Sequence, residues 1–281
     1  MIQNIFSQIL DRKREAIAQF RAHSSSDFRE RALKIRKNAE PHRLRRALES
    51  DSLQLKIIAE FKRRSPSAGI IRDDLTVSEI VRCYERGGAC AISVLTDEQY
   101  FGGSVADLCA ARISTNLPLL RKDFIIDPIQ ILEAAVAGAD AVLLIVAALD
   151  ETSLTQLRAL AEDELGLDAL VETHTSGELR RALNAGARII GVNNRDLRTF
   201  RISLKTSERL IAEAPCDRIL ISESGLQRAE SLLRLRTLGF RGFLIGEALM
   251  REQDPEASLR DLVAVGDERQ STGVSTGVCR P

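Results

Sequence analysis

Several features are missing from this chain of 281 residues, and each absence excludes a class of protein. No segment holds the run of about 18 apolar residues that crosses a bilayer, and the N-terminus lacks the apolar core of a signal peptide. Lys plus Arg number 40 and Asp plus Glu number 40, a balance that argues against the broad basic face that nucleic-acid binding requires. We therefore expect a cytoplasmic protein that binds neither membranes nor nucleic acid.

Cysteine and histidine are also scarce, and their spacing suggests no metal site. The three histidines cannot build a ligand cluster on their own. The five cysteines lack the paired spacing of a zinc site or a disulfide framework; they are Cys83, Cys90, Cys109, Cys216 and Cys279. We expect reduced thiols and no zinc site.

Short apolar runs are the main feature that the chain does have. Consecutive apolar positions over four to eight residues are typical of parallel strands buried on both faces. The runs are Leu53–Ala59, Cys90–Leu95, Leu117–Leu120, Ala141–Ala147, Asp168–Val171, Ile189–Val192, Arg218–Ile221 and Gly242–Ile245. The first is the least regular, because Gln54 and Lys56 interrupt it.

Segments with helical periodicity lie between these runs, and they carry start and stop signals. Thr76 and Glu79 form a capping-box pattern, and Asp254–Pro255 marks another start, with Gly266 as its expected stop. Glycine also recurs where a helix should end and the next strand begin, at Gly88, Gly138, Gly186 and Gly239.

A strand followed by a helix, repeated eight times, predicts an α/β fold of the (β/α)8 TIM barrel class. The alternative is an open doubly wound sheet, but no Gly-rich dinucleotide fingerprint follows the first strand. We expect the barrel to occupy residues 51–266 and residues 1–50 to form an N-terminal helical extension packed on it. Residues 267–281 have almost no apolar pattern and are expected to be disordered. The basic stretch Arg29–Arg46 is interpreted as a solvated helix face.

The active site of such a barrel forms at the carboxyl ends of its strands, so polar residues there are candidates. Alternation along a strand lets Glu60 and Lys62 point into the mouth together. The five charged candidates are Glu60, Lys62, Lys122, Glu172 and Glu223. Two cations among three carboxylates in one cleft push pKa values apart and can supply an acid and a base, although a structural ion-pair network would look similar.

Two further groups of residues follow strands seven and eight, where barrels of this class often bind phosphate. They are Ser224 with Gly225 and Gly246 with Glu247. Their backbone amides would hold a dianion, so we expect a small phosphorylated substrate. His174, just past Glu172, is interpreted as a hydrogen-bonded loop residue rather than as a catalyst.

Six motifs in order and in register resemble the indole-3-glycerol-phosphate synthase family. They are IAEFKRRSPSAG from Ile58, SVLTDEQYFGGS from Ser93, LRKDFIID from Leu120, GVNNRDL from Gly191, SESG from Ser222 and LIGEALM from Leu244. The resemblance implies a carboxy-lyase of tryptophan biosynthesis. It would convert 1-(2-carboxyphenylamino)-1-deoxyribulose 5-phosphate to indole-3-glycerol phosphate by ring closure, decarboxylation and dehydration, without a cofactor. It also makes other tryptophan-pathway enzymes candidate partners.

The resemblance further implies the roles of the catalytic residues. Lys122 would be the general acid of ring closure, its ammonium held by Asp123 or by a carboxylate of the mouth. Glu172 would act in dehydration with Glu60 assisting, Lys62 would pair with Glu60 and the substrate, and Asn193 would orient the reacting chain. Substrate-binding and phosphate-binding residues would be Ser65, Arg195, Phe101, Glu223, Ser224, Gly225, Gly246 and Glu247, with an apolar wall from Leu143 to Ile145.

Two alternatives remain open at this stage. One is a different phosphate-binding barrel enzyme such as a phosphoribosylanthranilate isomerase, which needs a cysteine and an aspartate at strand ends; Cys83 and Cys109 fall in expected helices instead, and Cys90 falls at the wrong end of a strand. The other is a non-catalytic barrel that binds a phosphorylated metabolite, although such a chain need not retain Lys122, Glu172 and Glu60 together.

Overall fold

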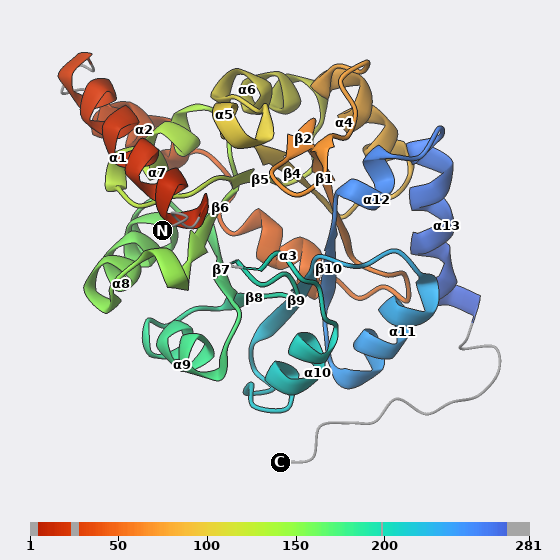
Figure 1. Ribbon diagram of the computed structural model, residues 1–281. Helices are drawn as coiled ribbons and strands as arrows, with labels where there is room; N and C mark the ends of the chain where they lie inside the picture. Colours follow the sequence, from red (N-terminus) through yellow and green to blue (C-terminus); the bar gives the residue numbers. More distant parts are fainter. Residues whose placement is uncertain (1–4, 24–27, 198, 269–281) are drawn as a thin grey trace.

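A closed barrel of eight parallel strands forms the centre of the protein (Figure 1). The computed structural model describes residues 5–23, 28–197 and 199–268. Around the ring the strand order is β1-β10-β9-β8-β7-β6-β5-β4. These strands are β1 Ile57–Phe61, β4 Ala91–Leu95, β5 Leu119–Lys122, β6 Ala141–Ile145, β7 Asp168–Thr173, β8 Ile189–Asn193, β9 Ile219–Glu223 and β10 Gly242–Ile245. The predicted (β/α)8 barrel is confirmed, and the open sheet is excluded.

Helices surround the barrel, and three more precede it. The helices that follow the strands are α4 Val77–Arg86, α6 Val105–Ser114, α7 Pro128–Val136, α8 Glu151–Ala159, α9 Ser176–Asn184, α10 Lys205–Ile211, α11 Ala229–Leu238 and α13 Pro255–Glu268. The N-terminal helices are α1 Ile5–His23, α2 Phe28–Lys37 and α3 Arg43–Glu49. Shorter elements are β2 Arg64–Ser65, β3 Gly69–Ile70, α5 Glu98–Phe101, α12 Glu247–Met250, a 3-10 turn at Val146–Ala148 and a π-helical turn at Leu160–Glu164.

The local start and stop signals are largely where the sequence predicts them. Thr76 caps α4 in a reciprocal capping box with Glu79. The glycines at the joints between helices and strands have the positive φ that favours this residue, 88° at Gly88 and 117° at Gly239. The predicted stop at Gly266 is wrong, because α13 continues to Glu268. From residue 269 on, the expected disordered tail lies outside the described residues.

The first strand differs most from its prediction. The structure begins β1 at Ile57 rather than Leu53 and continues it to Phe61. The predicted start was too early, because the segment with Gln54 and Lys56 precedes the strand. The apolar run stops at Ala59, while backbone pairing beside β4 continues through Phe61, so Glu60 lies within the strand, as its alternation with Lys62 required.

Two apolar layers stabilise the barrel, and alternation along each strand divides the side chains between them. Ile57 and Ala59 pack outward under the helices, whereas Ile58 belongs to the cluster inside the barrel. Helix α3 closes the amino-terminal end of the barrel, where fully buried Leu44 and Leu48 join the inner cluster. In the described part of the chain, apolar side chains therefore fill the inside of the barrel below its mouth at the carboxyl ends of the strands.

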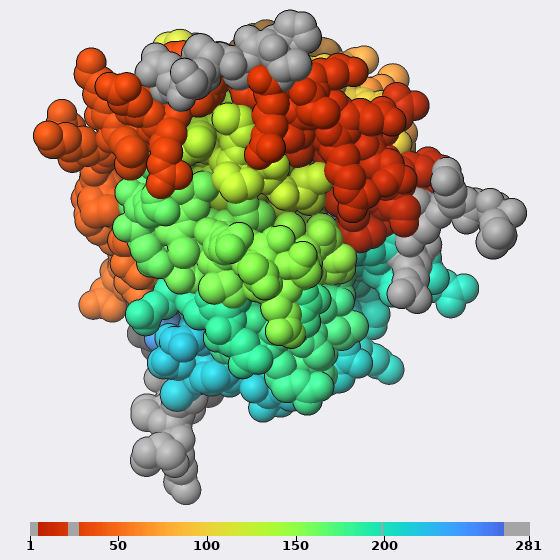
Figure 2. All heavy atoms as spheres, turned by 90° about the vertical axis from the view of Figure 1, so that its left-hand side faces the viewer, coloured from red at the N-terminus to blue at the C-terminus, as the bar shows by residue number. Residues whose placement is uncertain are grey.

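Helices α1 and α2 cover part of one side of the molecule, red to orange at the top of Figure 2. Helix α2 packs against α7, and Arg36 at its end donates hydrogen bonds to the carbonyls of Leu165 (2.9 Å) and Gly166 (3.0 Å). The helical extension predicted from the sequence is therefore present. Residue 50 as a domain boundary stays a prediction.

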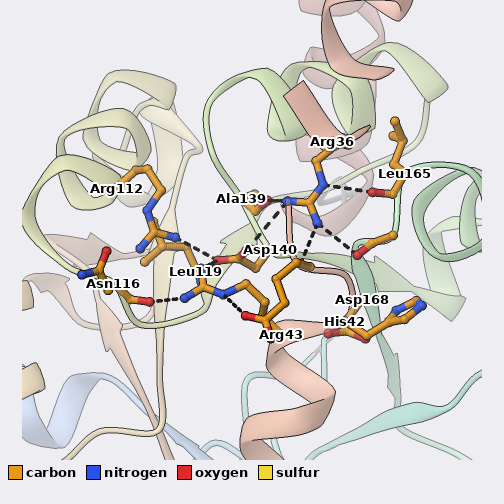
Figure 3. A network of polar contacts seen from close by, with 12 residues as sticks. Arg36, His42, Arg43, Arg112, Asn116, Leu119, Ala139, Asp140, Leu165 and Asp168 are labelled. Atoms are coloured by element: carbon orange, nitrogen blue, oxygen red, sulfur yellow. Dashed lines mark hydrogen bonds and ion pairs between the residues drawn. The ribbon is translucent and has the colours of Figure 1, made fainter. Parts of the chain in front are cut away.

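Asp140, directly before β6, is the centre of a polar network at the amino-terminal end of the barrel (Figure 3). One carboxylate oxygen accepts hydrogen bonds from Arg43 (3.0 Å), Arg112 (2.9 Å) and the backbone N–H of Leu119 (3.0 Å). Arg36 lies 3.8 Å from the other oxygen. The network joins α2, α3 and α6 to the barrel through one buried carboxylate.

Replacing Asp140 is expected to destabilise the fold. Asp140→Ala leaves several arginines without their buried counter-charge, and such a loss typically costs about 3–5 kcal/mol. The free energy of unfolding in urea measures the effect. Asp217→Ala is the control, because its pair with Arg218 is exposed and surface pairs contribute about 0–1 kcal/mol. Equal stability of the two variants would contradict a structural role for the network.

The described residues contain no helix that is both long and apolar enough to cross a membrane. The four cysteines among those residues are free thiols, and they are Cys83, Cys90, Cys109 and Cys216. Cys83 lies in α4 and Cys109 in α6, as predicted, and Cys90 directly precedes β4. Cys279 lies outside the described residues.

Candidate active site

A cavity of about 570 Å³ opens at the carboxyl ends of the strands. It brings together all thirteen site residues predicted from the sequence. They are Glu60, Lys62, Ser65, Phe101, Lys122, Glu172, Asn193, Arg195, Glu223, Ser224, Gly225, Gly246 and Glu247. Within the described residues, no group of three or more His, Cys, Asp or Glu side chains is arranged to hold a metal ion.

The alternation of the barrel strands explains why the charged residues meet. In β5, Leu120 packs inside the barrel, so Lys122, two residues later, faces the same way and reaches the cavity. The same step of two leads from Ile58 to Glu60, from Leu170 to Glu172 and from Ile221 to Glu223. Each of these four charged side chains thus continues a column of apolar side chains inside the barrel.

Lys122 is held between two carboxyl groups. Its Nζ lies 3.4 Å from Oε2 of Glu172 and 3.6 Å from Oε2 of Glu223. Burial alone would lower the pKa of Lys122, but the charges of Glu172, Glu223 and Glu60 outweigh burial and raise that pKa above its ordinary value. Lys122 is therefore a cation at neutral pH. Of the two links expected from the sequence, the structure has the one to the mouth carboxylates.

Asp123 points away from Lys122 and has other partners. Its carboxylate lies 2.6 Å from Nζ of Lys13 and 3.2 Å from Arg121. It also accepts a hydrogen bond of 2.6 Å from the Thr96 hydroxyl. The opposite direction follows from strand alternation, because adjacent residues face opposite sides.

Glu60 and Glu172 are both held in the ionised form. Lys62 Nζ lies 2.8 Å from Oε1 of Glu60. Burial would raise the pKa of Glu60, but the charges of Lys62 and Lys122 lower it below the ordinary value. Burial likewise opposes ionisation of Glu172, and the charges of Lys122 and His174 and a hydrogen bond from Asn193 lower its pKa. Both carboxylates can act as bases.

Glu223 is in the opposite state. Both its carboxyl oxygens are buried, with no hydrogen-bond partner among the described residues. Burial, followed by the charge of Glu172, raises the pKa of Glu223 to about 8. Carboxyl groups with opposite pKa shifts in one cavity can serve as an acid and a base at the same pH.

The raised pKa of Glu223 predicts a pH-dependent stability. The folded state keeps a proton on Glu223 from its ordinary pKa of 4.5 up to about 8, whereas the unfolded state loses it, so stability falls as pH rises through this window. Glu223→Gln cannot lose a proton. It should match the parent near pH 4.5 and exceed its stability increasingly up to pH 8, as measured by urea unfolding at both ends of the window. Glu49 is exposed, so the free energy of unfolding of Glu49→Gln should change with pH in the same way as that of the parent. A constant difference between Glu223→Gln and the parent would contradict the shift.

Two glycines make room for the carboxylates. A Cβ on Gly191, in β8, would lie 2.1 Å from Oε1 of Glu223. A Cβ on Gly246 would lie 2.5 Å from Oε1 of Glu60. Gly191 was not predicted from the sequence to be a site residue. Its signal was a glycine in the middle of a buried strand, which often marks a close approach.

The rim after β9 and β10 has an unusual backbone. Ser224 has a φ of 67° and Gly225 a φ of 76°. The left-handed conformation is costly for serine, and such strain tends to occur at functional sites. Glu247 Oε1 accepts a 3.0 Å hydrogen bond from Arg251, and Arg195 lies 3.8 Å from its other oxygen. The neighbouring cations offset the negative charge that Glu247 brings to the rim.

The loop after β1 closes another side of the cavity. Ser67 accepts a 3.0 Å hydrogen bond from Arg195, and Asn193 accepts one of 2.9 Å from the backbone N–H of Arg195. Ser65 accepts a hydrogen bond of 3.2 Å from the backbone N–H of Ala68. Ser67 Oγ also lies 3.4 Å from Ser65 Oγ, so Ser67 links Ser65 to Arg195 along one edge of the cavity.

The family model described as "Indole-3-glycerol phosphate synthase" matches residues 6–262. The chain belongs to the indole-3-glycerol phosphate synthase family. Three curated relatives carry that name. The one from Aromatoleum aromaticum is 49% identical, and the match covers 73% of this chain and 78% of the relative. The one from Carboxydothermus hydrogenoformans is 48% identical over 80% of this chain and 86% of the relative, and the one from Zymomonas mobilis subsp. pomaceae is 41% identical over 94% and 100%. Family membership therefore covers both the barrel and most of the N-terminal extension.

A solved structure of a thiamine phosphate pyrophosphorylase from Pyrococcus furiosus shares the fold of this member of the indole-3-glycerol phosphate synthase family. Its TM-score is 0.58 at 17% identity, and the match covers 76% of this chain and 96% of that chain. At this identity the likeness concerns the barrel architecture alone.

The N-terminal helix α1 contributes a wall that the sequence did not predict for this family member. Ile5, Phe6 and Ile9 line the cavity. Phe6 meets Phe124 edge-on, with ring centroids 6.1 Å apart. Lys13 fastens the helix to the barrel mouth through Asp97 (3.1 Å) and Asp123. The periodicity of α1 indicated an amphipathic helix but not which part of the barrel it would cover.

Proposed function

We propose that this chain catalyses the reaction named by its family, the formation of indole-3-glycerol phosphate. The observation that carries the proposal is Lys122, a largely buried cation between Glu172 and Glu223 in a cavity whose rim suits a phosphate. The substrate would be 1-(2-carboxyphenylamino)-1-deoxyribulose 5-phosphate. Ring closure, loss of carbon dioxide and loss of water would then follow in one site.

Ring closure needs a proton donor at the ribulose carbonyl. Lys122 remains protonated at neutral pH and would donate to the carbonyl oxygen as the aromatic carbon attacks the carbonyl carbon. The new carbon–carbon bond interrupts the aromatic ring. Departure of the carboxylate as carbon dioxide returns an electron pair to the ring and restores aromaticity.

Dehydration needs a base and an acid in succession. Glu172 is ionised and would take a proton from the carbon bonded to the ring nitrogen, with Glu60 assisting, and then give that proton to the departing hydroxyl, which leaves as water. Lys62, 2.8 Å from Glu60, would stabilise that carboxylate and the leaving hydroxyl. Asn193, which hydrogen-bonds to Glu172, would orient the reacting chain.

Binding would divide the substrate between two ends of the cavity. The backbone of Ser224, Gly225, Gly246 and Glu247 would hold the phosphate. The aromatic ring would pack against Leu143, Ile145 and Phe101, which line the cavity together. Ser65 and Arg195 would meet an anionic group, and Glu223 a hydroxyl of the ribulose chain. Action in the cytoplasm and association with other tryptophan-pathway enzymes remain predictions.

Indole formation tests the proposal directly. The chain contains no tryptophan, so indole absorbance and fluorescence would rise from a low background when enzyme meets substrate. We expect multiple turnovers without added metal. Substrate binding without any indole signal would favour a metabolite-binding barrel, and the absence of both would favour a different phosphate substrate.

A further inference from the structure

His174 is a largely buried, titratable side chain next to the proposed acid–base group, and the roles above do not use it. It follows β7, two residues after Glu172, so both side chains face the same way. Its Nε2 lies 3.4 Å from Oε1 of Glu172. That nitrogen is buried and makes no hydrogen bond among the described residues.

The orientation of the His174 ring is fixed from its other side. Nδ1 lies 3.1 Å from Oε2 of Glu178, at the start of α9. The same oxygen accepts a 2.8 Å hydrogen bond from the backbone N–H of His174. A carboxylate at Nδ1 places a proton there and leaves Nε2 facing Glu172. The side chains form a chain from Glu178 through His174 to Glu172.

The state of Nε2 then decides how Glu172 behaves. A lone pair on Nε2 would repel an ionised Glu172, whereas a proton on Nε2 would attract it. The charges around the imidazole favour the proton. Burial lowers the pKa of His174, but the hydrogen bond to Glu178 on α9 and the charges of Glu172 on β7 and Glu178 raise that pKa above its ordinary value. Glu223 on β9 also faces the imidazole. Arg209 on α10 faces the His174 carbonyl at 3.4 Å, and Lys122 lies beyond Glu172.

We propose that His174 is a positioning residue, an imidazolium that orients Glu172 and keeps it ionised as the base of the dehydration step. Oε1 of Glu172 faces His174 while Oε2 faces Lys122, so the two cations fix both oxygens of the carboxylate. This inference rests on the proposed function, because it assigns a role within that reaction. It also replaces the interpretation of His174 as a loop residue only.

Two substitutions separate this role from a structural one. His174→Asn keeps a donor near Nδ1 for Glu178 but removes the group that faces Glu172. We expect kcat to fall about tenfold, KM to stay within about twofold, and the acidic limb of the kcat profile to move up by about one pH unit, because Glu172 loses a neighbouring cation. His174→Gln can donate a neutral hydrogen bond to Glu172. It should recover part of the kcat but keep the displaced limb.

His42→Asn is the matched control. His42 lies 3.3 Å from Asp168, at the opposite end of the same strand, and asparagine tolerates its φ of 53°. This variant should keep the parent profile. Thermal unfolding of every variant shows whether it folds. If His174→Asn fails to fold, the pH profile of His174→Gln decides the test.

The outcomes separate two failures. If the parent enzyme forms no indole, the proposed function fails. If the parent is active and both His174 variants have its pH profile, or if His42→Asn shifts the limb equally, the role of His174 is overturned.

Discussion

Lys122→Ala is expected to lower kcat by more than about a hundredfold, since it removes the proposed proton donor of ring closure. Carbon dioxide and indole should be delayed together in a single turnover, because both would come after the proposed ring closure. Phosphate binding at the rim should survive. The effect is measured as the rate of the reaction, by recording indole fluorescence and carbon dioxide release.

Lys56→Ala is the control for that variant. Lys56 precedes β1 at the closed end of the barrel and hydrogen-bonds to Ser50, so its loss should leave kcat unchanged. Turnover by Lys122→Ala within a few-fold of the parent would remove Lys122 from the mechanism. An equal fall in Lys56→Ala would point to a general loss of structure.

Glu172→Gln is expected to separate the two halves of the reaction. The amide keeps the shape of the side chain but cannot accept a proton, so kcat for indole formation should fall by about 10²–10⁴-fold. Lys122 keeps Glu223 as a partner, so ring closure and decarboxylation should continue for one turnover. We expect carbon dioxide to appear without indole fluorescence in a single-turnover experiment.

Glu162→Gln provides a buried glutamate outside the cavity as control. Glu162 lies 2.8 Å from Arg158 on the outer face of the barrel. This variant should form both products at the parent's rate. If Glu172→Gln lost both products together, Glu172 would belong to ring closure as well, and the division of labour with Lys122 would be wrong.

The strands of the barrel could be predicted because their middles are continuous apolar runs. Their ends could not be predicted from those runs. The predicted run ended at Ile221, but β9 continues to Glu223, and β5 likewise continues past Leu120 to Lys122. Backbone pairing continues after the side chains become polar, because the inward positions there serve the site rather than the core.

The charged candidates could be predicted because each lies at the carboxyl end of a strand or just beyond it, and the barrel brings these ends to one rim. The contributions of Gly191 and Lys13 could not. Gly191 matters because a side chain there would clash with Glu223, and this clash can be seen only once β8 lies beside β9. Lys13 lies outside the barrel repeat, and its partners Asp97 and Asp123 follow two different strands.

The contacts between the N-terminal helices and the barrel affect the order in which this protein can fold during its synthesis on the ribosome. Arg36 and its carbonyl partner on Leu165 are separated by 129 residues. At about 5–20 residues per second, the first helices wait on the order of ten seconds before their binding surface has been synthesised. During that wait Leu44 and Leu48, which later close the barrel, have no apolar partner and are open to chaperones or to aggregation.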